Sequence, residues 1–153
     1  MKQLVHQIDE LESFISQHKM LKEKISNASV GWHIAHLAMV MKGVPAALKK
    51  SKPEDYKPYF NLNKFLVLTF KYIPRGRAKA PNAVTPPTLA FDTEKLKTLL
   101  QGARDALKDL DSLPPSANFS HPMFGPINLA QALSFLAIHN AHHIKIIRDI
   151  VKK

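Results

Sequence analysis

In the segment FLAIHNAHHIKII, residues 135–147, His139, His142 and His143 interrupt an apolar run that contains no proline or glycine. At about 100° per residue, the apolar side chains from Leu129 to Val151 form one stripe of a predicted helix. His139 and His143 fall near the centre of that stripe, and His142 falls at its edge. Burying an unpaired imidazole nitrogen costs roughly 1–3 kcal/mol. Histidines at core positions of this helix therefore need a partner.

The rest of the chain shows helical apolar spacing between proline-marked connections, and no run alternates like a strand. We expect a first helix over residues 2–18 and a second that starts at Asn27 or Ser29 and that Pro45 ends or kinks. A third candidate over residues 61–72 could instead be a short buried strand. A fourth helix should run from Asp92 or Thr93 to about residue 113, and a last one should start at Asn128. A long proline-rich loop connects Ile73 to Phe91. The sequence thus predicts an all-α protein, most economically a four-helix bundle.

Length and composition limit the class of protein. A chain of 153 residues predicts a single domain over residues 1–153. It has no apolar run as long as the roughly 18 residues of a membrane span and no signal-peptide pattern at its start, so we expect no membrane partner and a cytoplasmic location. The absence of cysteine excludes disulfides, thiolate ligands and cysteine nucleophiles. Any metal must bind through nitrogen or oxygen.

The formal net charge of +10 raises the possibility of nucleic-acid binding, because clustered Lys and Arg neutralise phosphates. The lysines are spread along the whole chain, however, and KYIPRGRAK, residues 71–79, is the only concentrated basic stretch. No zinc finger, helix-turn-helix signature or RNA-binding aromatic motif accompanies it. A solvated basic surface is the favoured interpretation, and a nucleic-acid partner is not expected.

The spacing of the histidines favours a metal site. His139 and His143 are four residues apart, so one helix face presents two nitrogens to one ion. The second helix, VGWHIAHLAMV (residues 30–40), offers a third nitrogen from His33 or His36, and the helical wheel prefers His33. Zinc, nickel or ferrous iron would suit such a set. The alternative is that these histidines are hydrogen-bonded core residues without a metal.

Two further histidines are candidates for a pocket around such a site. His121, in SHPMFG at residues 120–125, could donate a proton or form a pocket wall, although a turn histidine fixed by Pro122 is the simpler interpretation. His142 could form part of the pocket rim. Trp32 could do the same, but packing alone would explain it.

Three motifs carry a resemblance to a known family. NASVGWHIAHLA, HPMFGPIN and HNAHHIKII, at residues 27–38, 121–128 and 139–147, are similar to motifs of the DinB/YfiT-like metalloenzymes, including a branch of unknown function with a His-Pro-x-Phe-Gly turn before the last helix. The resemblance implies a DinB-like four-helix bundle that holds one divalent metal on three histidines. Transferred by motif position, the ligands are His36, His139 and His143, with His33 beside them as a pocket residue.

The resemblance also implies a function. It indicates a metal-dependent transferase or hydrolase of undetermined substrate and, as a class of chemistry only, the transfer of a low-molecular-weight thiol to a small electrophile. Related bundles frequently pair, so a homodimer is an expectation as well. Two alternatives remain: a non-catalytic helical bundle whose metal site is vacant or weak, and a basic nucleic-acid-binding protein.

Overall fold

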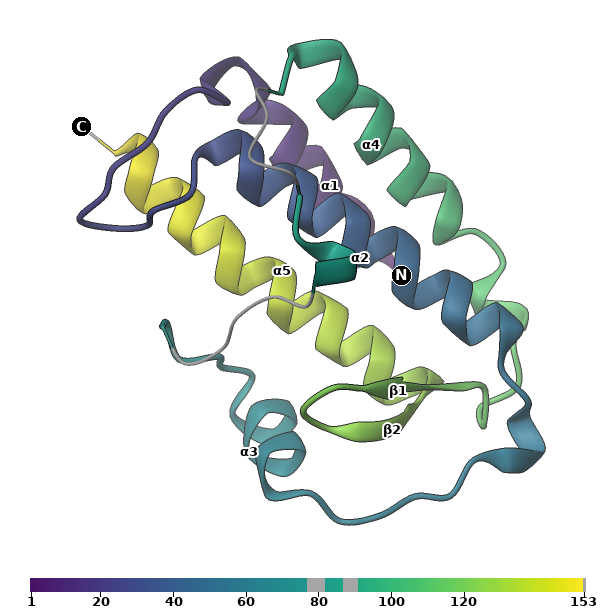
Figure 1. Ribbon diagram of the computed structural model, residues 1–153. Coiled ribbons are helices and arrows are strands. Elements are labelled where there is room, and N and C mark those ends of the chain that lie inside the picture. The colour runs from purple at the N-terminus through teal and green to yellow at the C-terminus, as the bar shows by residue number, and fades with distance from the viewer. Residues whose placement is uncertain (77–81, 87–90, 153) are drawn as a thin grey trace.

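The computed structural model describes residues 1–76, 82–86 and 91–152 and is mostly helical (Figure 1). Its helices and strands are, in chain order, α1 (Lys2–Ser13), α2 (Val30–Lys50), α3 (Leu62–Phe70), α4 (Thr93–Ala106), β1 (Asn118–His121), β2 (Gly125–Asn128) and α5 (Leu129–Val151). Short 3-10 turns lie at Ile15–Gln17, Pro53–Asp55, Asn82–Val84 and Leu110–Ser112. No helix among the described residues is long and apolar enough to cross a membrane.

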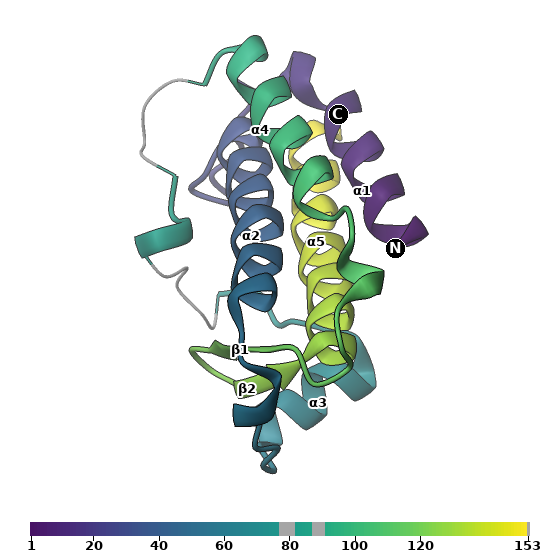
Figure 2. The ribbon, with the colours of Figure 1, turned by 90° about the vertical axis from the view of Figure 1, so that its right-hand side faces the viewer.

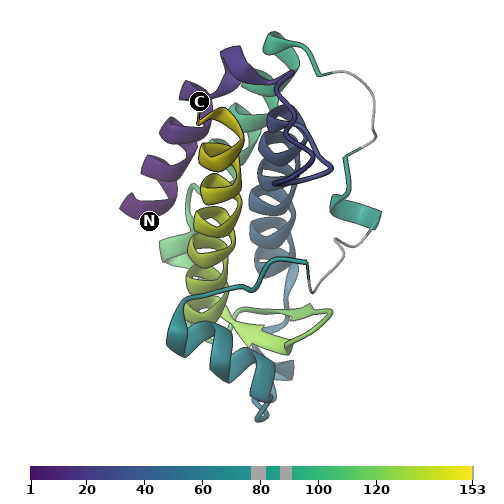
Figure 3. The same cartoon turned by 90° about the vertical axis from the view of Figure 1, so that its left-hand side faces the viewer.

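Four long helices lie side by side. Helix α2 packs against both α4 and α5, and α1 packs against α5 and α4 (Figure 2). Helix α3 and the strand pair lie at the end of the molecule where α5 begins, and α3 packs on α5 (Figure 3). The neighbouring position of α2 and α5 matters most here, because these two helices carry the histidine motifs.

The apolar stripes expected from the sequence form the core. On α5, Leu136 and Ile147 are fully buried, and Ile34 and Met41 are their counterparts on α2. On the outer face of α5, Lys145 is exposed, as the helical wheel predicts. The helical spacing therefore identified the buried faces correctly.

Side-chain caps start the helices where the sequence predicts them. Ser29 accepts a hydrogen bond from the Trp32 amide at 3.2 Å, which selects Ser29 over Asn27 as the cap of α2. Asp92 caps α4 in the same way. Asn128 caps α5 and exchanges bonds with Gln131 in a capping box. Each cap satisfies an amide that the first helical turn would otherwise leave unpaired.

Two expected helix ends are wrong. Helix α1 ends at Ser13 instead of continuing to about His18, and the Ser13 hydroxyl donates to the Glu10 carbonyl at 2.6 Å. A serine that bonds the preceding turn in this way competes with the helical backbone bonds. Helix α4 ends at Ala106 instead of continuing to about residue 113, and a short 3-10 turn at Leu110–Ser112 follows it.

The sequence predicts that Pro45 ends or kinks α2, and the first of these outcomes is not observed, because the helix continues to Lys50. Pro45 and Leu48 are both buried, and this apolar burial offsets the hydrogen bond that a proline cannot donate.

The connection before α5 contains a strand pair that the sequence did not predict. Strands β1 and β2 are antiparallel, with Asn118 opposite Asn128 and His121 opposite Gly125. Gly125 adopts a φ of +65°, which favours glycine at the end of this turn. Four-residue strands without alternating burial give little sequence signal.

The two remaining expectations concern the middle of the chain. The segment that could have been a short buried strand is helix α3, and Phe65 on it is 51% exposed. Of the proline-rich loop between Ile73 and Phe91, residues 77–81 and 87–90 lie outside the described residues. Its described part includes the turn at Asn82–Val84, which lies against α2.

Candidate metal centre

Four histidines from two helices gather between α2 and α5. His33 and His36 are one helical turn apart on α2, and both are buried, with exposures of 3% and 2%. His139 and His143 are one turn apart on α5 and partly buried. Because α2 and α5 pack together, the two histidine pairs face each other.

Three of these imidazoles come close enough to share one ion. His36, His139 and His143 each offer a ring nitrogen, and these three atoms lie within 4.8 Å of one another. Nε2 of His36 and Nε2 of His139 lie 3.3 Å apart. The rings of His139 and His143 are 4.7 Å apart, as their spacing on one helix face predicts. The structure thus brings together the three histidines that the motif resemblance selects, whereas the helical wheel preferred His33.

The hydrogen bonding of His36 fixes which of its nitrogens faces the group. Nδ1 of His36 lies 2.6 Å from the backbone oxygen of Val84. A carbonyl oxygen only accepts hydrogen bonds, so Nδ1 carries the hydrogen and donates it. The neutral ring then keeps a lone pair on Nε2, the atom beside His139. An N–H···O=C bond on the outer nitrogen is the usual support of a metal-binding histidine.

His139 has few partners of its own. Its Nδ1 is buried and has no hydrogen-bond partner among the described residues. Among the described residues, the one hydrogen-bonding neighbour of its Nε2 is the imidazole of His36. An unpaired buried nitrogen costs roughly 1–3 kcal/mol. A cation among these rings would give His139 the strong ligand bond that the protein does not supply.

Burial keeps these rings neutral. It lowers the pKa of His33 to about 4, with smaller contributions from the charges of His36, His142 and Arg75. Burial likewise lowers the pKa of His36 and holds the pKa values of His139 and His143 well below 6.5. Only a neutral imidazole has a lone pair for a metal ion. At neutral pH the group is therefore in the protonation state that a metal requires.

The other candidate histidines lie around this group. His33 is turned toward His143, and Nδ1 of each ring lies 2.9 Å from Nδ1 of the other. His142 is partly buried and meets the His143 ring edge-on at 5.1 Å. Burial lowers its pKa too, against a backbone hydrogen bond to Ile73 that raises it.

His121 lies on β1 and is engaged locally. Its Nδ1 accepts the amides of Met123 and Phe124 at 3.2 and 3.3 Å, and its ring stacks on Phe124 at 4.3 Å. Burial lowers its pKa to about 4. The same ring meets Phe135 edge-on, and Phe135 in turn contacts His139. His121 thus approaches the histidine group through Phe135.

Two residues that contact the histidine group, Val84 and Ser26, were not predicted from the sequence, and the contact of a third, Trp32, was underestimated. The Val84 carbonyl has no signature, because any residue offers a backbone oxygen. Ser26, whose Oγ lies 3.0 Å from Nε2 of His33, precedes the helix cap in a segment without helical spacing. Trp32 was attributed to packing, yet its ring stacks on His36 with centroids 5.1 Å apart and planes 13° apart.

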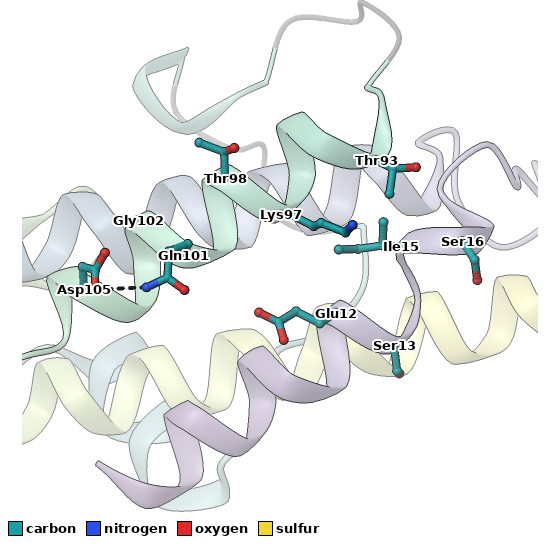
Figure 4. Close-up of a pocket in the computed structure, with 10 residues that line it drawn as sticks. All are labelled: Glu12, Ser13, Ile15, Ser16, Thr93, Lys97, Thr98, Gln101, Gly102 and Asp105. Carbon is teal, nitrogen blue, oxygen red and sulfur yellow. Dashed lines mark hydrogen bonds between the residues drawn. The ribbon is translucent and has the colours of Figure 1, made fainter.

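A cavity of about 950 Å³ lies elsewhere, between α1 and α4 (Figure 4). Most of the residues that line it are of polar types, among them Glu12, Lys97 and Gln101, the last of which donates to Asp105 at 3.1 Å. None of the six candidate histidines lines it. This cavity is therefore not part of the histidine group.

Comparison with known proteins gives a family. No curated protein and no solved structure matches the chain. The sequence matches the DinB superfamily over residues 3–147, a range that contains all four histidines of the group. The match covers nearly the whole chain, and the three clustered histidines fit a metal-binding member. The chain belongs to the DinB superfamily.

Proposed function

We propose that this protein is a metal-dependent enzyme in which His36, His139 and His143 hold one divalent ion. The ion would lie between α2 and α5 of a DinB-like four-helix bundle formed by α1, α2, α4 and α5. The observation that carries the proposal is the approach of three neutral imidazole nitrogens, from two helices, to within 4.8 Å of one another. Zinc, nickel and ferrous iron all accept such a nitrogen set.

The proposed chemistry is the transfer of a low-molecular-weight thiol to a small electrophile. Three protein ligands leave coordination positions for water or substrate, which distinguishes catalytic from structural sites. A bound divalent ion would lower the pKa of a water or thiol and supply a nucleophile at neutral pH. Val84 orients His36 through its carbonyl, and the rings of Trp32 and Phe135 flank the ligands and exclude water from them.

Metal analysis of untagged protein tests the ligand set. We expect one divalent ion per chain, and its loss in His139→Ala and His143→Ala, because each variant keeps only two of the three protein ligands that a catalytic site of this kind uses. His6→Ala is the matched control, since His6 is exposed on α1. Metal-free wild-type protein, with variants of unchanged stability, would instead support a non-catalytic helical bundle.

A screen of small thiols against electrophilic acceptors tests the reaction. We expect metal-loaded wild-type protein to consume both reactants faster than metal-free protein, and His143→Ala to behave like the metal-free sample. Consumption at equal rates in all three samples would contradict the proposed reaction and leave the metal site to be judged by its own measurement.

The charge of +10 keeps nucleic-acid binding as a second candidate. Three of the arginines pair with acids, as in Arg104 with Asp9 and Glu12, and Arg148 with Glu10, which reduces the positive charge they offer. Steeply salt-dependent binding to random oligonucleotides would favour this candidate. We expect no such binding.

A further inference from the structure

We infer that His33 and Ser26 are positioning residues, which hold His143 in the tautomer that carries its hydrogen on Nδ1. Nε2 of His143 then keeps the lone pair with which the ring can bind an ion. The inference rests on the proposed metal site for its functional meaning. The tautomer itself is a property of the protein without metal.

The contacts form one continuous chain of hydrogen bonds. Nδ1 of His143 lies 2.9 Å from Nδ1 of His33, and Nε2 of His33 lies 3.0 Å from Oγ of Ser26. The amide of Ala28 donates to the same Oγ at 3.1 Å. His33 is 3% exposed, so its two ring nitrogens depend on these partners.

Hydrogens can be placed along this chain in only two ways, because each neutral imidazole carries one. If the Ser26 hydroxyl donates to His33, then His33 donates to His143, and the hydrogen of His143 occupies Nε2. If Ser26 accepts instead, His33 accepts from Nδ1 of His143, and Nε2 of His143 is left with its lone pair. Only the second arrangement allows His143 to bind a metal through Nε2.

The proposed ligand role of His143 selects the second arrangement, because only that arrangement leaves Nε2 with its lone pair. The Ala28 amide donates to Oγ of Ser26 in either arrangement, and in the second the remaining acceptor position of that oxygen takes the ring N–H of His33. In this arrangement His36 on α2 and His143 on α5 each donate from Nδ1 to an acceptor. The acceptor is the Val84 carbonyl for His36 and the His33 ring for His143. The two ligands are held in the same tautomer by different acceptors.

This support explains why a helix with one ligand has a second buried histidine. His33 is absent from the group of three that can share an ion. Leucine at position 33 would fill the volume, but it would leave Nδ1 of His143 without a partner. Outer partners of this kind typically change metal affinity by about 10–100-fold.

Nitrogen-15 NMR of the histidine rings tests the tautomer directly in metal-free protein at pH 7.5. We expect the His143 ring to carry its hydrogen on Nδ1 in the wild type. In His33→Phe, which keeps a ring of similar size without nitrogens, we expect the hydrogen to move to Nε2. A wild-type His143 with its hydrogen on Nε2 would overturn the inference, whatever metal the protein binds.

Zinc affinity, measured by competition with a chromophoric chelator, tests the consequence. We expect the Kd to rise about 10–100-fold in His33→Phe and less in Ser26→Ala. We expect His33→Asn to recover most of the affinity, because its amide oxygen can accept near the position of Nδ1. His6→Asn, at an exposed site, is the matched control and should leave the affinity unchanged.

The two measurements separate the possible failures. A wild-type protein that binds no zinc would refute the proposed function, while the NMR result would still decide the tautomer. A folded His33→Phe with wild-type affinity and an unchanged tautomer would overturn the inference and leave the proposed function intact. If His33→Phe does not fold, Ser26→Ala and the wild-type spectrum carry the test.

Discussion

At the scale of single residues, hydrogen placement decides what an imidazole can do. His36 and His143 each have one nitrogen engaged by an outer partner, the Val84 carbonyl and the His33 ring. The other nitrogen of each ring is then free to bind a metal ion. His139 lacks such a partner among the described residues, and its Nδ1 is buried unpaired. The three candidate ligands are therefore not equivalent, and the two supported rings define where an ion would bind.

Trp32 offers a direct readout of His36. It is the only tryptophan of the chain, and it stacks on the His36 ring at 5.1 Å. We expect its fluorescence to fall during titration with Ni²⁺ and to reach a plateau at one equivalent, because a paramagnetic ion next to the stacked ring quenches the indole. His36→Ala should abolish the saturable part. A plateau that persists in His36→Ala would place the ion elsewhere.

At the scale of elements, the signals that predicted this fold were local. Ser29, Asp92 and Asn128 mark helix starts by their chemistry, and apolar spacing marks the buried faces. A helix end at Pro45, one of the two outcomes that the sequence predicts, is not observed, because the burial that keeps α2 helical beyond it comes from contacts with other elements. The strand pair at residues 118–128 was missed because its pairing, and not its side-chain pattern, defines it.

In the candidate site, too, the local features were predicted from the sequence and the long-range contacts were not. The spacing of His139 and His143 predicted that one face of α5 presents both. The choice of His36 over His33 came from motif resemblance, since the helical wheel favoured the wrong member of the pair for the close group. The Val84 carbonyl lies 48 residues from His36 in sequence, and nothing local predicts that contact.

The cap of α5 should contribute stability without controlling the site. Asn128 and Gln131 satisfy each other's amides at the start of the helix. Replacing Asn128 with alanine should reduce the free energy of unfolding by about 0.5–2 kcal/mol, measured by urea denaturation. Metal affinity should be retained, because His139 lies three turns further along the helix. Lys145→Ala, exposed on the same helix, should be nearly neutral, and an equal loss in both variants would argue against the cap.

At the scale of the whole molecule, a basic chain keeps its clustered histidines neutral in the interior. The net charge of +10 counts all eight histidines as uncharged. The rings with lowered pKa values would add positive charge to the region between α2 and α5 if they took up protons. Acid therefore opposes both the packing of these two helices and the binding of a cation between them.

Acid should destabilise the metal-free protein in a defined range. The pKa of His33 falls from 6.5 to about 4 on folding, so the unfolded chain takes up the proton first and the free energy of unfolding decreases as the pH falls from about 6.5 toward 4. His33 alone contributes up to about 3 kcal/mol to this decrease. Urea denaturation at pH 7.5 and pH 5 measures the first part of this decrease, to which His33 contributes about 2 kcal/mol.

Two comparisons check the cause of that pH dependence. His33→Phe should show a shallower decrease, because one of the titrating rings is gone. Saturating zinc should raise the unfolding midpoint at pH 7.5, and ethylenediaminetetraacetate should reverse the rise, since a ligand that binds only the folded state stabilises it by mass action. A free energy of unfolding that is constant or increases between pH 7.5 and 5 would contradict the role of the buried rings.

The separation of His36 and His139 by 103 residues has a consequence for biosynthesis. A ribosome releases α2 long before it has made α5, so the nascent chain holds one imidazole of the trio while both partners are still missing. Binding of an ion by all three histidines of the proposed site would then come only after translation has passed His143. A shortage of the ion would leave finished chains without metal rather than stalled ones.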